Sequence, residues 1–249
     1  MLGYLISKVG NFVENAMMRN IIGQSQSGFD IREVMDQKKI LLVNLSKGKT
    51  GEVNSNLLGL IIVSKLQMAA LGRADLPEEQ RHDFYLYIDE FQNFITDSIA
   101  TILSEARKYR LDLTIAHQYV GQLTPKGDTQ IRDAVLGNVG SMIVYRIGIE
   151  DAELLAKEFA PTFNAYDLVN VERFTTYVKL LIENTASKPF TMVGLPPMAG
   201  GDPKLVAALK QLSRLKFGRP RALVEAEILE RAELGAPSAP QQPSMEPRL

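Results

Sequence analysis

Two adjacent carboxylates stand directly after a short apolar run in this chain. The run is 84–88, and Asp89 and Glu90 follow it. In α/β folds the carboxyl ends of parallel strands are where ligands bind. At such an edge the first acid can hold Mg²⁺, and the second can orient and deprotonate an attacking water, as nucleotide hydrolysis requires. A solvated pair of acids at a strand end is the alternative interpretation.

A polar side chain also follows the next apolar run. Leu111 to Ala116 has the composition of a strand, and His117 and Gln118 come directly after it. Because one helical segment separates this run from the first, both strands are expected to end at the same edge of a parallel sheet. An amide at that edge can contact a γ-phosphate or position a water. A glutamine that merely opens a loop is the alternative.

The elements that must position these residues alternate between strands and helices along the chain. Apolar residues at helical spacing indicate helices, and short β-rich apolar runs indicate buried strands. Strands are expected at 39–45, 84–88, 111–116, 141–146, 173–182 and 190–193. Helices are expected at 4–22, 57–71, 99–109, 129–135, 151–159 and 202–233, the last interrupted near Gly218 and Pro220. The alternation predicts an α/β fold with a mostly parallel sheet between helices.

Local signals add detail around the second helix. Asn54 or Ser55 is expected to cap the helix 57–71, because short polar side chains satisfy free amides at helix N-termini. The polar segment 72–82 is expected to form a surface loop. The Pro-rich segment 235–249 lacks the apolar residues needed to fold, so we expect one domain over 1–234 and a disordered tail.

Composition excludes several classes of function. The chain has 249 residues, 45% of them hydrophobic, and a formal net charge of −1, so no global field attracts nucleic acid or anionic membrane. It contains no cysteine, which excludes disulfides, thiolate metal sites and cysteine nucleophiles, and its two histidines could not build a zinc site alone. The longest apolar stretch is far shorter than the roughly 20 residues of a membrane helix, and no signal peptide is evident. We therefore expect a cytoplasmic chain without a transmembrane segment.

The motifs together resemble the conjugative type IV secretion coupling proteins, a family within the FtsK/HerA-type P-loop motors. The runs that match its Walker B motif, linking helix and glutamine motif are 84–94, 104–111 and 116–118, and further matches lie at 18–24, 137–140, 145–146, 150–152 and 213–221. The resemblance implies a RecA-like ATPase fold with ATP and Mg²⁺ as cofactors. Asp89 would bind the metal and, with Gln118, the nucleotide, while Glu90 would act on water.

The resemblance also implies partners and a trans-acting arginine. It implies DNA, other secretion-system components and a homo-oligomeric ring, a hexamer, located in the cytoplasm or at the inner face of the membrane through partners. Arg107 would reach the nucleotide of a neighbouring subunit, where a guanidinium stabilises the transferring phosphoryl group. Arg146 is a weaker candidate for that role, and a solvated helix arginine is the alternative for Arg107.

One part of the family's nucleotide pocket has no match in the chain. The phosphate-binding loop G-x-x-x-x-G-K-[ST], or Walker A, is not found, because Val43 stands where the first glycine should precede Gly48-Lys49-Thr50. That tripeptide is expected to be an ordinary loop. The chain is therefore interpreted as the C-terminal part of a motor ATPase domain, truncated, split or degenerate, with little ATPase activity in isolation.

Positive charge near the end of the fold offers a surface for nucleic acid. The basic residues are Lys204, Lys210, Arg214, Lys216, Arg219 and Arg221. They could follow a phosphate backbone without reading sequence, whereas a solvated helical face is the alternative. Three functions are thus compared: a fragment of a DNA-translocating motor, a non-hydrolysing ring subunit or adaptor of the same fold, and a DNA-binding module with no motor role.

Overall fold

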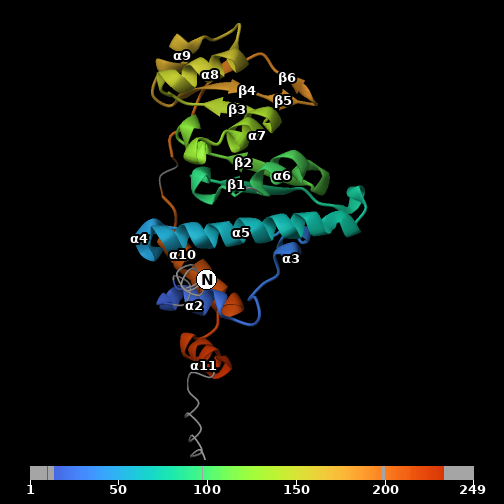
Figure 1. Ribbon diagram of the computed structural model, residues 1–249, viewed down its shortest axis with the longest axis vertical. Helices are drawn as coiled ribbons and strands as arrows, with labels where there is room; N and C mark the ends of the chain where they lie inside the picture. The colour runs from blue at the N-terminus through green and yellow to red at the C-terminus, as the bar shows by residue number, and fades with distance from the viewer. Residues whose placement is uncertain (1–9, 11–13, 97, 198–199, 233–249) are drawn as a thin grey trace, which may run out of the picture. The chain divides into compact units, whose positions relative to one another are not determined.

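The computed structural model describes residues 10, 14–96, 98–197 and 200–232 of the chain (Figure 1). The chain divides into two compact units, one formed by 1–29 with 201–249 and the other by 30–200. The expected tail 235–249 and the first part of the expected helix 4–22 lie outside the described residues. The boundary of a single ATPase domain at residue 234 stays a prediction.

The larger unit is built around one pair of parallel strands. β1 (Phe84–Ile88) and β2 (Leu111–Ile115) pair in a register that sets Phe84 opposite Leu111 and Ile88 opposite Ile115. The crossover between them is η3 (Phe91–Phe94), α6 (Ser98–Glu105) and η4 (Ala106–Tyr109). Because the strands are parallel and in this register, the residues that follow Ile88 and Ile115 emerge at the same edge. The expected strands 84–88 and 111–116 are confirmed to within one residue.

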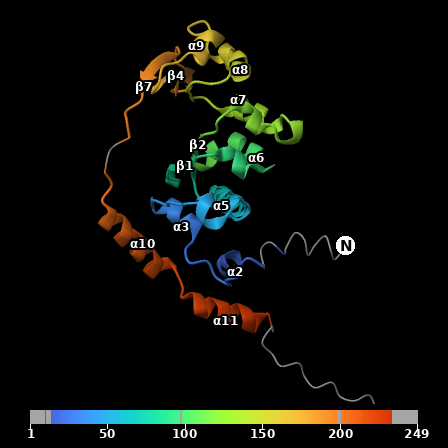
Figure 2. The same ribbon diagram turned by 90° about the vertical axis from the view of Figure 1, so that its left-hand side faces the viewer.

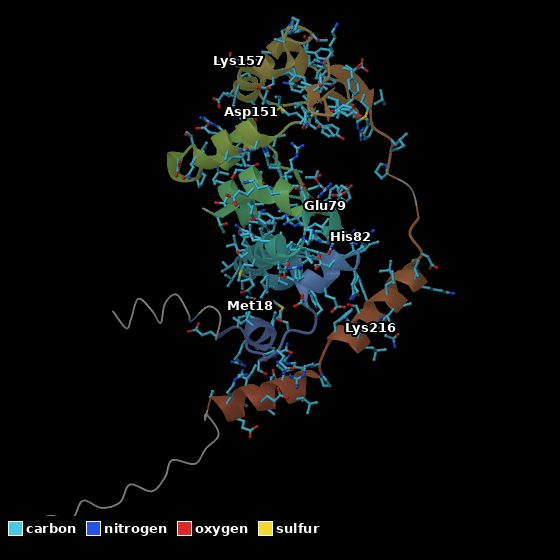
Figure 3. The ribbon with its side chains drawn as sticks, turned by 90° about the vertical axis from the view of Figure 1, so that its right-hand side faces the viewer. Met18, Glu79, His82, Asp151, Lys157 and Lys216 are labelled. Carbon is cyan, nitrogen blue, oxygen red and sulfur yellow. The ribbon has the colours of Figure 1, made fainter. Side chains whose placement is uncertain are left out.

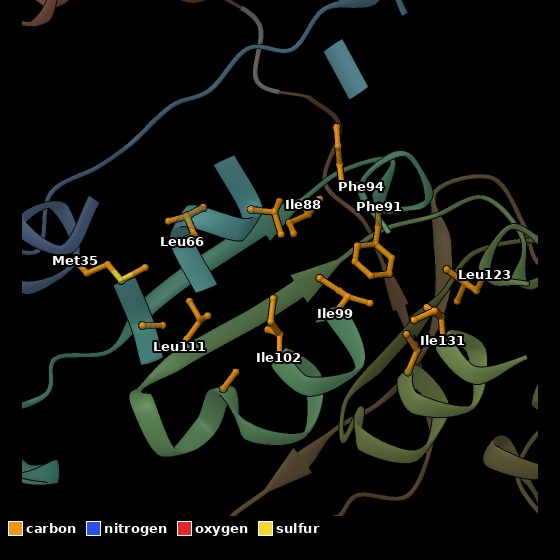
Figure 4. Close-up of a cluster of buried hydrophobic side chains, with 14 residues drawn as sticks. Met35, Leu66, Ile88, Phe91, Phe94, Ile99, Ile102, Leu111, Leu123 and Ile131 are labelled. Carbon is orange, nitrogen blue, oxygen red and sulfur yellow. The ribbon is translucent and has the colours of Figure 1, made fainter. Parts of the chain in front are cut away.

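Alternation along β1 separates a core face from an exposed face. Phe84, Leu86 and Ile88 pack against a cluster of buried apolar side chains, whereas Tyr85 and Tyr87 are 61% and 71% exposed. The cluster joins the strands to four α-helices, α3 (Ile31–Asp36), α5 (Glu52–Gly72), α6 and α7 (Gln130–Asn138). Its labelled members in Figure 4 are Met35, Leu66, Ile88, Phe91, Phe94, Ile99, Ile102, Leu111, Leu123 and Ile131. This core fixes the strand ends that carry the candidate site.

The long helix α5 begins earlier than expected and has a different cap. A four-residue helix, α4 (Lys47–Thr50), precedes it, and Gly51 stands between them with φ of 79°, a conformation that favours glycine. The expectation that Asn54 or Ser55 caps the helix was wrong. Both residues lie in its first turns, where the Asn54 amide donates to the Thr50 carbonyl at 2.8 Å.

By length and composition, the span Glu52–Asp75 is the one helical segment among the described residues that could cross a membrane. It contains α5 and η1 (Arg73–Asp75), and 33% of its most apolar window is buried. Val63, Leu66 and Ala70 of α5 lie in the core with β1 and β2. These contacts are those of a core helix in a layered fold, a kind of helix that passes the same test.

The expected strand 39–45 was wrong, because the structure has no regular element there. Ile40 and Leu42 are each 88% exposed, while Leu45 packs against the core. No described strand pairs with this segment, and an apolar run does not form a strand without a neighbour to satisfy its backbone. Composition alone could not reveal that missing neighbour.

The expected surface loop 72–82 is partly internal. It contains two short helices, η1 and η2 (Glu78–Gln80), and the Arg73 side chain in η1 is fully buried. The Arg73 guanidinium donates to the Asp36 carboxylate at 3.0 Å and to the carbonyls of His82 and Tyr109 at 2.9 and 3.0 Å. Arg73 therefore links the end of α5 to the residues that precede β1 and β2.

The remainder of the larger unit contains a second core, a cluster of buried apolar side chains contributed mainly by two helices and two strands. The helices in this part of the chain are η5 (Val120–Leu123), η6 (Pro125–Gly127), α7 (Gln130–Asn138), α8 (Ile149–Phe159) and α9 (Ala165–Val169). The buried side chains of α7, Ile131 and Val135, belong to the first cluster. The strands in this part are β3 (Met142–Val144), β4 (Thr175–Lys179), β5 (Leu181–Ile182), β6 (Thr185–Ala186) and β7 (Phe190–Val193). The order β3-β4-β7 is antiparallel, and β5 with β6 makes a hairpin. The α/β class is confirmed, while parallel pairing among the described strands is confined to β1 and β2. α7 lies beside α6 (Figure 2).

The smaller unit combines segments from both ends of the chain. α2 (Ala16–Ile22) contacts α11 (Arg221–Arg231), where Asn20 donates to Glu225 at 3.0 Å, and α10 (Pro203–Phe217) precedes α11. The rings of Phe29 and Phe217 meet edge to face with centroids 5.9 Å apart. The expected interruption of 202–233 near Gly218 and Pro220 is confirmed, because α10 ends at Phe217 and α11 begins at Arg221.

Candidate functional site

Asp89 and Glu90 follow β1 in a tight turn at the carboxyl edge of the parallel pair. Glu90 adopts a left-handed conformation with φ of 51° and ψ of 45°, and its amide donates to the Asp89 Oδ1 at 3.0 Å. A non-glycine residue in this region is uncommon and turns the chain sharply. After this turn the Asp89 side chain is exposed and the Glu90 side chain is half-buried.

Gln118 reaches the same edge from β2. Its side-chain amide Nε2 donates to the Glu90 Oε1 at 2.9 Å. Backbone bonds close the edge beneath it: the Ala116 amide donates to the Ile88 carbonyl, and the Phe91 amide donates to the Ala116 carbonyl, both at 2.9 Å. The structure thus brings Asp89, Glu90 and Gln118 together, as the parallel register requires.

Two side chains that the sequence did not single out hold the loop after Gln118. The Gln122 Oε1 accepts from the amides of Gln118 and Tyr119 at 2.9 and 3.3 Å, and the Asp151 carboxylate accepts from the Val120 amide at 3.0 Å. Asp151 lies in the first turn of α8 in the second core (Figure 3). Three successive backbone amides are therefore satisfied by side chains, which holds the backbone of the loop at Gln118. The sequence signals for Asp151 were its place at the start of an expected helix and the family match at 150–152.

A second glutamine contacts the Glu90 carboxylate from η3. Gln92 Nε2 donates to the Glu90 Oε2 at 2.6 Å. Hydrogen bonds from the Gln118 amide and then from the Gln92 amide hold the pKa of Glu90 below its usual range, with a smaller contribution from the charge of Lys47. Glu90 is therefore ionised at neutral pH and has both oxygens oriented.

Lys47 brings a positive charge to the site from the segment before α5. Its ammonium group lies 2.8 Å from the Glu52 carboxylate and 3.3 Å from the Asn93 Oδ1. Asn93 in turn donates to the Glu90 carbonyl at 3.1 Å. The segment around Gly48 is the helix α4, where an ordinary loop was expected. Its lysine at position 47 is the side chain that reaches toward the site.

The two candidate arginines are not brought to this edge within one chain. Arg107 is exposed in η4, which leads into the first residue of β2, at the opposite end of the parallel pair from Gln118. Five strand residues separate the two ends, about 16 Å at roughly 3.3 Å per residue. Arg146 is exposed just after β3. The role of Arg107 therefore stays a prediction, and it requires a neighbouring subunit.

The carboxylates fit Mg²⁺ only in part. No group of three or more acidic or histidine side chains among the described residues could hold a metal ion by itself. Mg²⁺ in nucleotide sites is commonly held by one or two carboxylates together with phosphate oxygens and waters, so a single exposed carboxylate such as Asp89 is compatible with it. Asp89 could therefore contribute one ligand to a metal that the phosphates hold in place.

The basic residues of the smaller unit divide into two groups. Lys204, Lys210, Arg214 and Lys216 are exposed on α10, which contains no acidic residue. Beyond that helix, Arg219 pairs with Glu227 at 2.9 Å and Arg221 with Glu225 at 2.7 Å. The positive charge expected from the sequence is thus partly neutralised outside α10.

The sequence of the chain matches a known protein family. A family model described as type IV secretory system conjugative DNA transfer matches residues 3–162, more than half of the chain. A search of the curated proteins found no match.

Solved structures of coupling proteins resemble the chain at low identity. The plasmid coupling protein TrwB in complex with ADP and Mg²⁺ is 17% identical with a TM-score of 0.48, and TrwB in complex with the non-hydrolysable GTP analogue GDPNP is 16% identical with a TM-score of 0.46. Each comparison covers 63% of this chain and 39% of the other, so the chain spans well under half the length of these proteins. On the strength of the family match, this chain belongs to the type IV secretory system conjugative DNA transfer family.

Proposed function

We propose that the chain is part of a DNA-translocating ATPase and supplies the hydrolytic half of its nucleotide site. The observation that carries the proposal is the 2.9 Å hydrogen bond from Gln118 to Glu90 at the edge where Asp89 also emerges. Asp89 has the role of magnesium ligand, Glu90 that of the base which orients and deprotonates water, and Gln118 that of a contact to the γ-phosphate. Mg²⁺, when bound, neutralises charge on the transferring phosphoryl group.

The phosphate-binding loop of this site is proposed to come from another part of the assembly. The edge of β2 that faces away from β1, and the edge of β3 that faces away from β4, have no strand partner among the described residues. Open strand edges accept an added strand. A strand that leads into a Walker A loop could pair with β2, which would place the loop beside Gln118.

Partners follow from the same family. The proposed assembly is a homo-oligomeric ring, a hexamer, in which Arg107 contacts the nucleotide of the adjacent subunit. DNA is the proposed cargo, and the exposed cations of α10 are its proposed contacts; other secretion-system components hold the ring at the cytoplasmic face of the membrane. A non-hydrolysing ring subunit is the second candidate, which the absence of a Walker A motif from the sequence upstream of this chain would favour.

The test is phosphate release from ATP by the chain alone and by the chain mixed with a polypeptide that carries a Walker A loop of the same family. The motor proposal predicts that only the mixture hydrolyses ATP. It also predicts that the mixture loses hydrolysis in Glu90→Gln, because a glutamine side chain keeps the shape of the glutamate but cannot accept the proton from water. Glu153→Gln on the exposed face of α8 is the matched control and should hydrolyse normally. No hydrolysis in any mixture would favour the non-hydrolysing subunit.

A DNA-binding module with no motor role makes a different prediction. In that case Asp89→Asn and Glu90→Gln would leave DNA binding and every other measured activity unchanged. The charge reversal Lys210→Glu with Arg214→Glu should instead weaken DNA binding and reduce its dependence on salt, because fewer counterions are released.

A further inference from the structure

The Glu90 carboxylate is held on both sides by the side-chain amides of two glutamines. Gln118 Nε2 donates to Oε1 at 2.9 Å, and Gln92 Nε2 donates to Oε2 at 2.6 Å. We propose that Gln92 is a positioning residue, which keeps the Glu90 carboxylate aimed at the attacking water when Gln118 turns to the nucleotide. The proposal rests on the function proposed above for Glu90.

The backbone of Gln92 is anchored by its neighbours in η3. Phe91 and Phe94 are both buried in the core beneath the sheet, and the Phe91 amide is bonded to the Ala116 carbonyl at the end of β2. Gln92 and Asn93 lie between these two rings and are only half-buried. The backbone of Gln92 therefore cannot move away from Glu90 unless aromatic side chains leave the core, which is costly.

The amide of Gln92 has one orientation that suits the carboxylate. Its Oε1 is buried and has no hydrogen-bond partner among the described residues, a state that costs about 1–3 kcal/mol. Rotating the amide by half a turn would place this oxygen against the Glu90 Oε2, and two acceptors repel. The bond to Glu90 is therefore the interaction that retains the amide in this orientation despite the unsatisfied oxygen.

Gln118 is held less firmly than Gln92. It is exposed and lies on the loop after β2, so a phosphate oxygen that accepts from its amide can draw it away from Glu90. Among the described residues, Gln92 would then remain the only amide donor to the carboxylate. Because a carboxylate oxygen has a second lone pair, Glu90 can still accept from a water while Gln92 holds it.

The first test compares the NMR signal of the Glu90 carboxyl carbon between variants of the full chain at neutral pH, without nucleotide. Gln92→Asn keeps the amide but is one methylene shorter, so it should lose the bond and shift the Glu90 carboxyl signal. Gln211→Asn on the exposed face of α10 is the control and should leave the signal unchanged. A Glu90 carboxyl signal that Gln92→Asn leaves unchanged would overturn the proposal.

The second test separates positioning from stability through steady-state kinetics of the Walker A mixture. Gln92→Asn should lower kcat on the order of ten- to a hundredfold, as expected when a reacting group is displaced by a fraction of an ångström or more. KM for ATP should stay the same. A raised KM with normal kcat would overturn the proposal. If the wild-type mixture does not hydrolyse ATP, the motor function fails, and the comparison of Glu90 carboxyl signals still decides whether Gln92 holds Glu90.

Discussion

Replacing the buried Arg73 should destabilise the larger unit far more than replacing any exposed arginine. The Arg73 side chain is completely inaccessible to solvent, and its guanidinium contacts the Asp36 carboxylate at 3.0 Å and the carbonyls of His82 and Tyr109 at 2.9 and 3.0 Å. In Arg73→Ala these acceptors lose their donors, and a cavity replaces the side chain.

The expected loss follows from the burial of Arg73, whose partner Asp36 is 31% exposed. Removing one partner of a fully buried ion pair costs about 3–5 kcal/mol. That is a large fraction of the roughly 5–15 kcal/mol by which a domain is stable. Because Arg32 also contacts Asp36, the Asp36 carboxylate keeps one partner, and we expect a loss of about 3 kcal/mol, at the lower end of that range.

Urea unfolding followed by far-UV circular dichroism measures the loss, and hydrogen exchange of the β1 and β2 amides assigns it to the larger unit. Arg110→Ala is the matched control: its partner Asp83 lies 3.3 Å away, both side chains are largely exposed, and such pairs contribute about 0–1 kcal/mol. A loss below about 1 kcal/mol in Arg73→Ala, equal to that of the control, would refute the reasoning.

Two further perturbations concern the elements around Glu90. A methyl group at Gly59 in α5 would lie 2.1 Å from the Phe94 ring. Gly59→Ala should therefore lower the free energy of unfolding by about 1–3 kcal/mol in thermal unfolding and reduce hydrolysis by the mixture. Gly137→Ala in α7, where an added methyl group has nothing within 4 Å, is the control and should be neutral or stabilising. Equal unfolding temperatures for the two variants would contradict this packing. Gln118→Ala should raise the pKa of Glu90, whose lowered folded-state value stabilises the protein above the unfolded pKa of about 4.3. The stability lost in Gln118→Ala should therefore be present at pH 7 and shrink as pH falls through the folded-state pKa; a loss that stays constant in urea titrations across that range would refute it.

The candidate site was predictable because it depends on two local patterns. A five-residue apolar strand ended by Asp89, and another followed by Gln118, suffice to place both residues at one edge once the strands are parallel. The helix break at Gly218 and Pro220 is equally local. Such features need no knowledge of distant contacts.

The parts that failed depend on neighbours that the local sequence does not contain. The run 39–45 has strand composition but no described partner, and Arg73 lies in a polar segment whose burial depends on Asp36 and on the carbonyls before both strands. Gln92 was missed for a related reason. The contact between Gln92 and Glu90 depends on Phe91 and Phe94, because the burial of these two rings in the core turns the Gln92 side chain toward Glu90.

The most direct test of a shared hydrolytic site is a double-mutant cycle on Glu90 and Gln118, measured as phosphate release by the mixture that contains a Walker A loop. If the two side chains act as one unit on water and the γ-phosphate, Glu90→Gln alone should remove nearly all activity, and Gln118→Leu added to it should cost little more. A double variant whose loss of activity equals the product of the two single losses would show that the side chains act independently. That result, or normal hydrolysis in Glu90→Gln, would contradict the assignment of this sheet edge as the hydrolytic site.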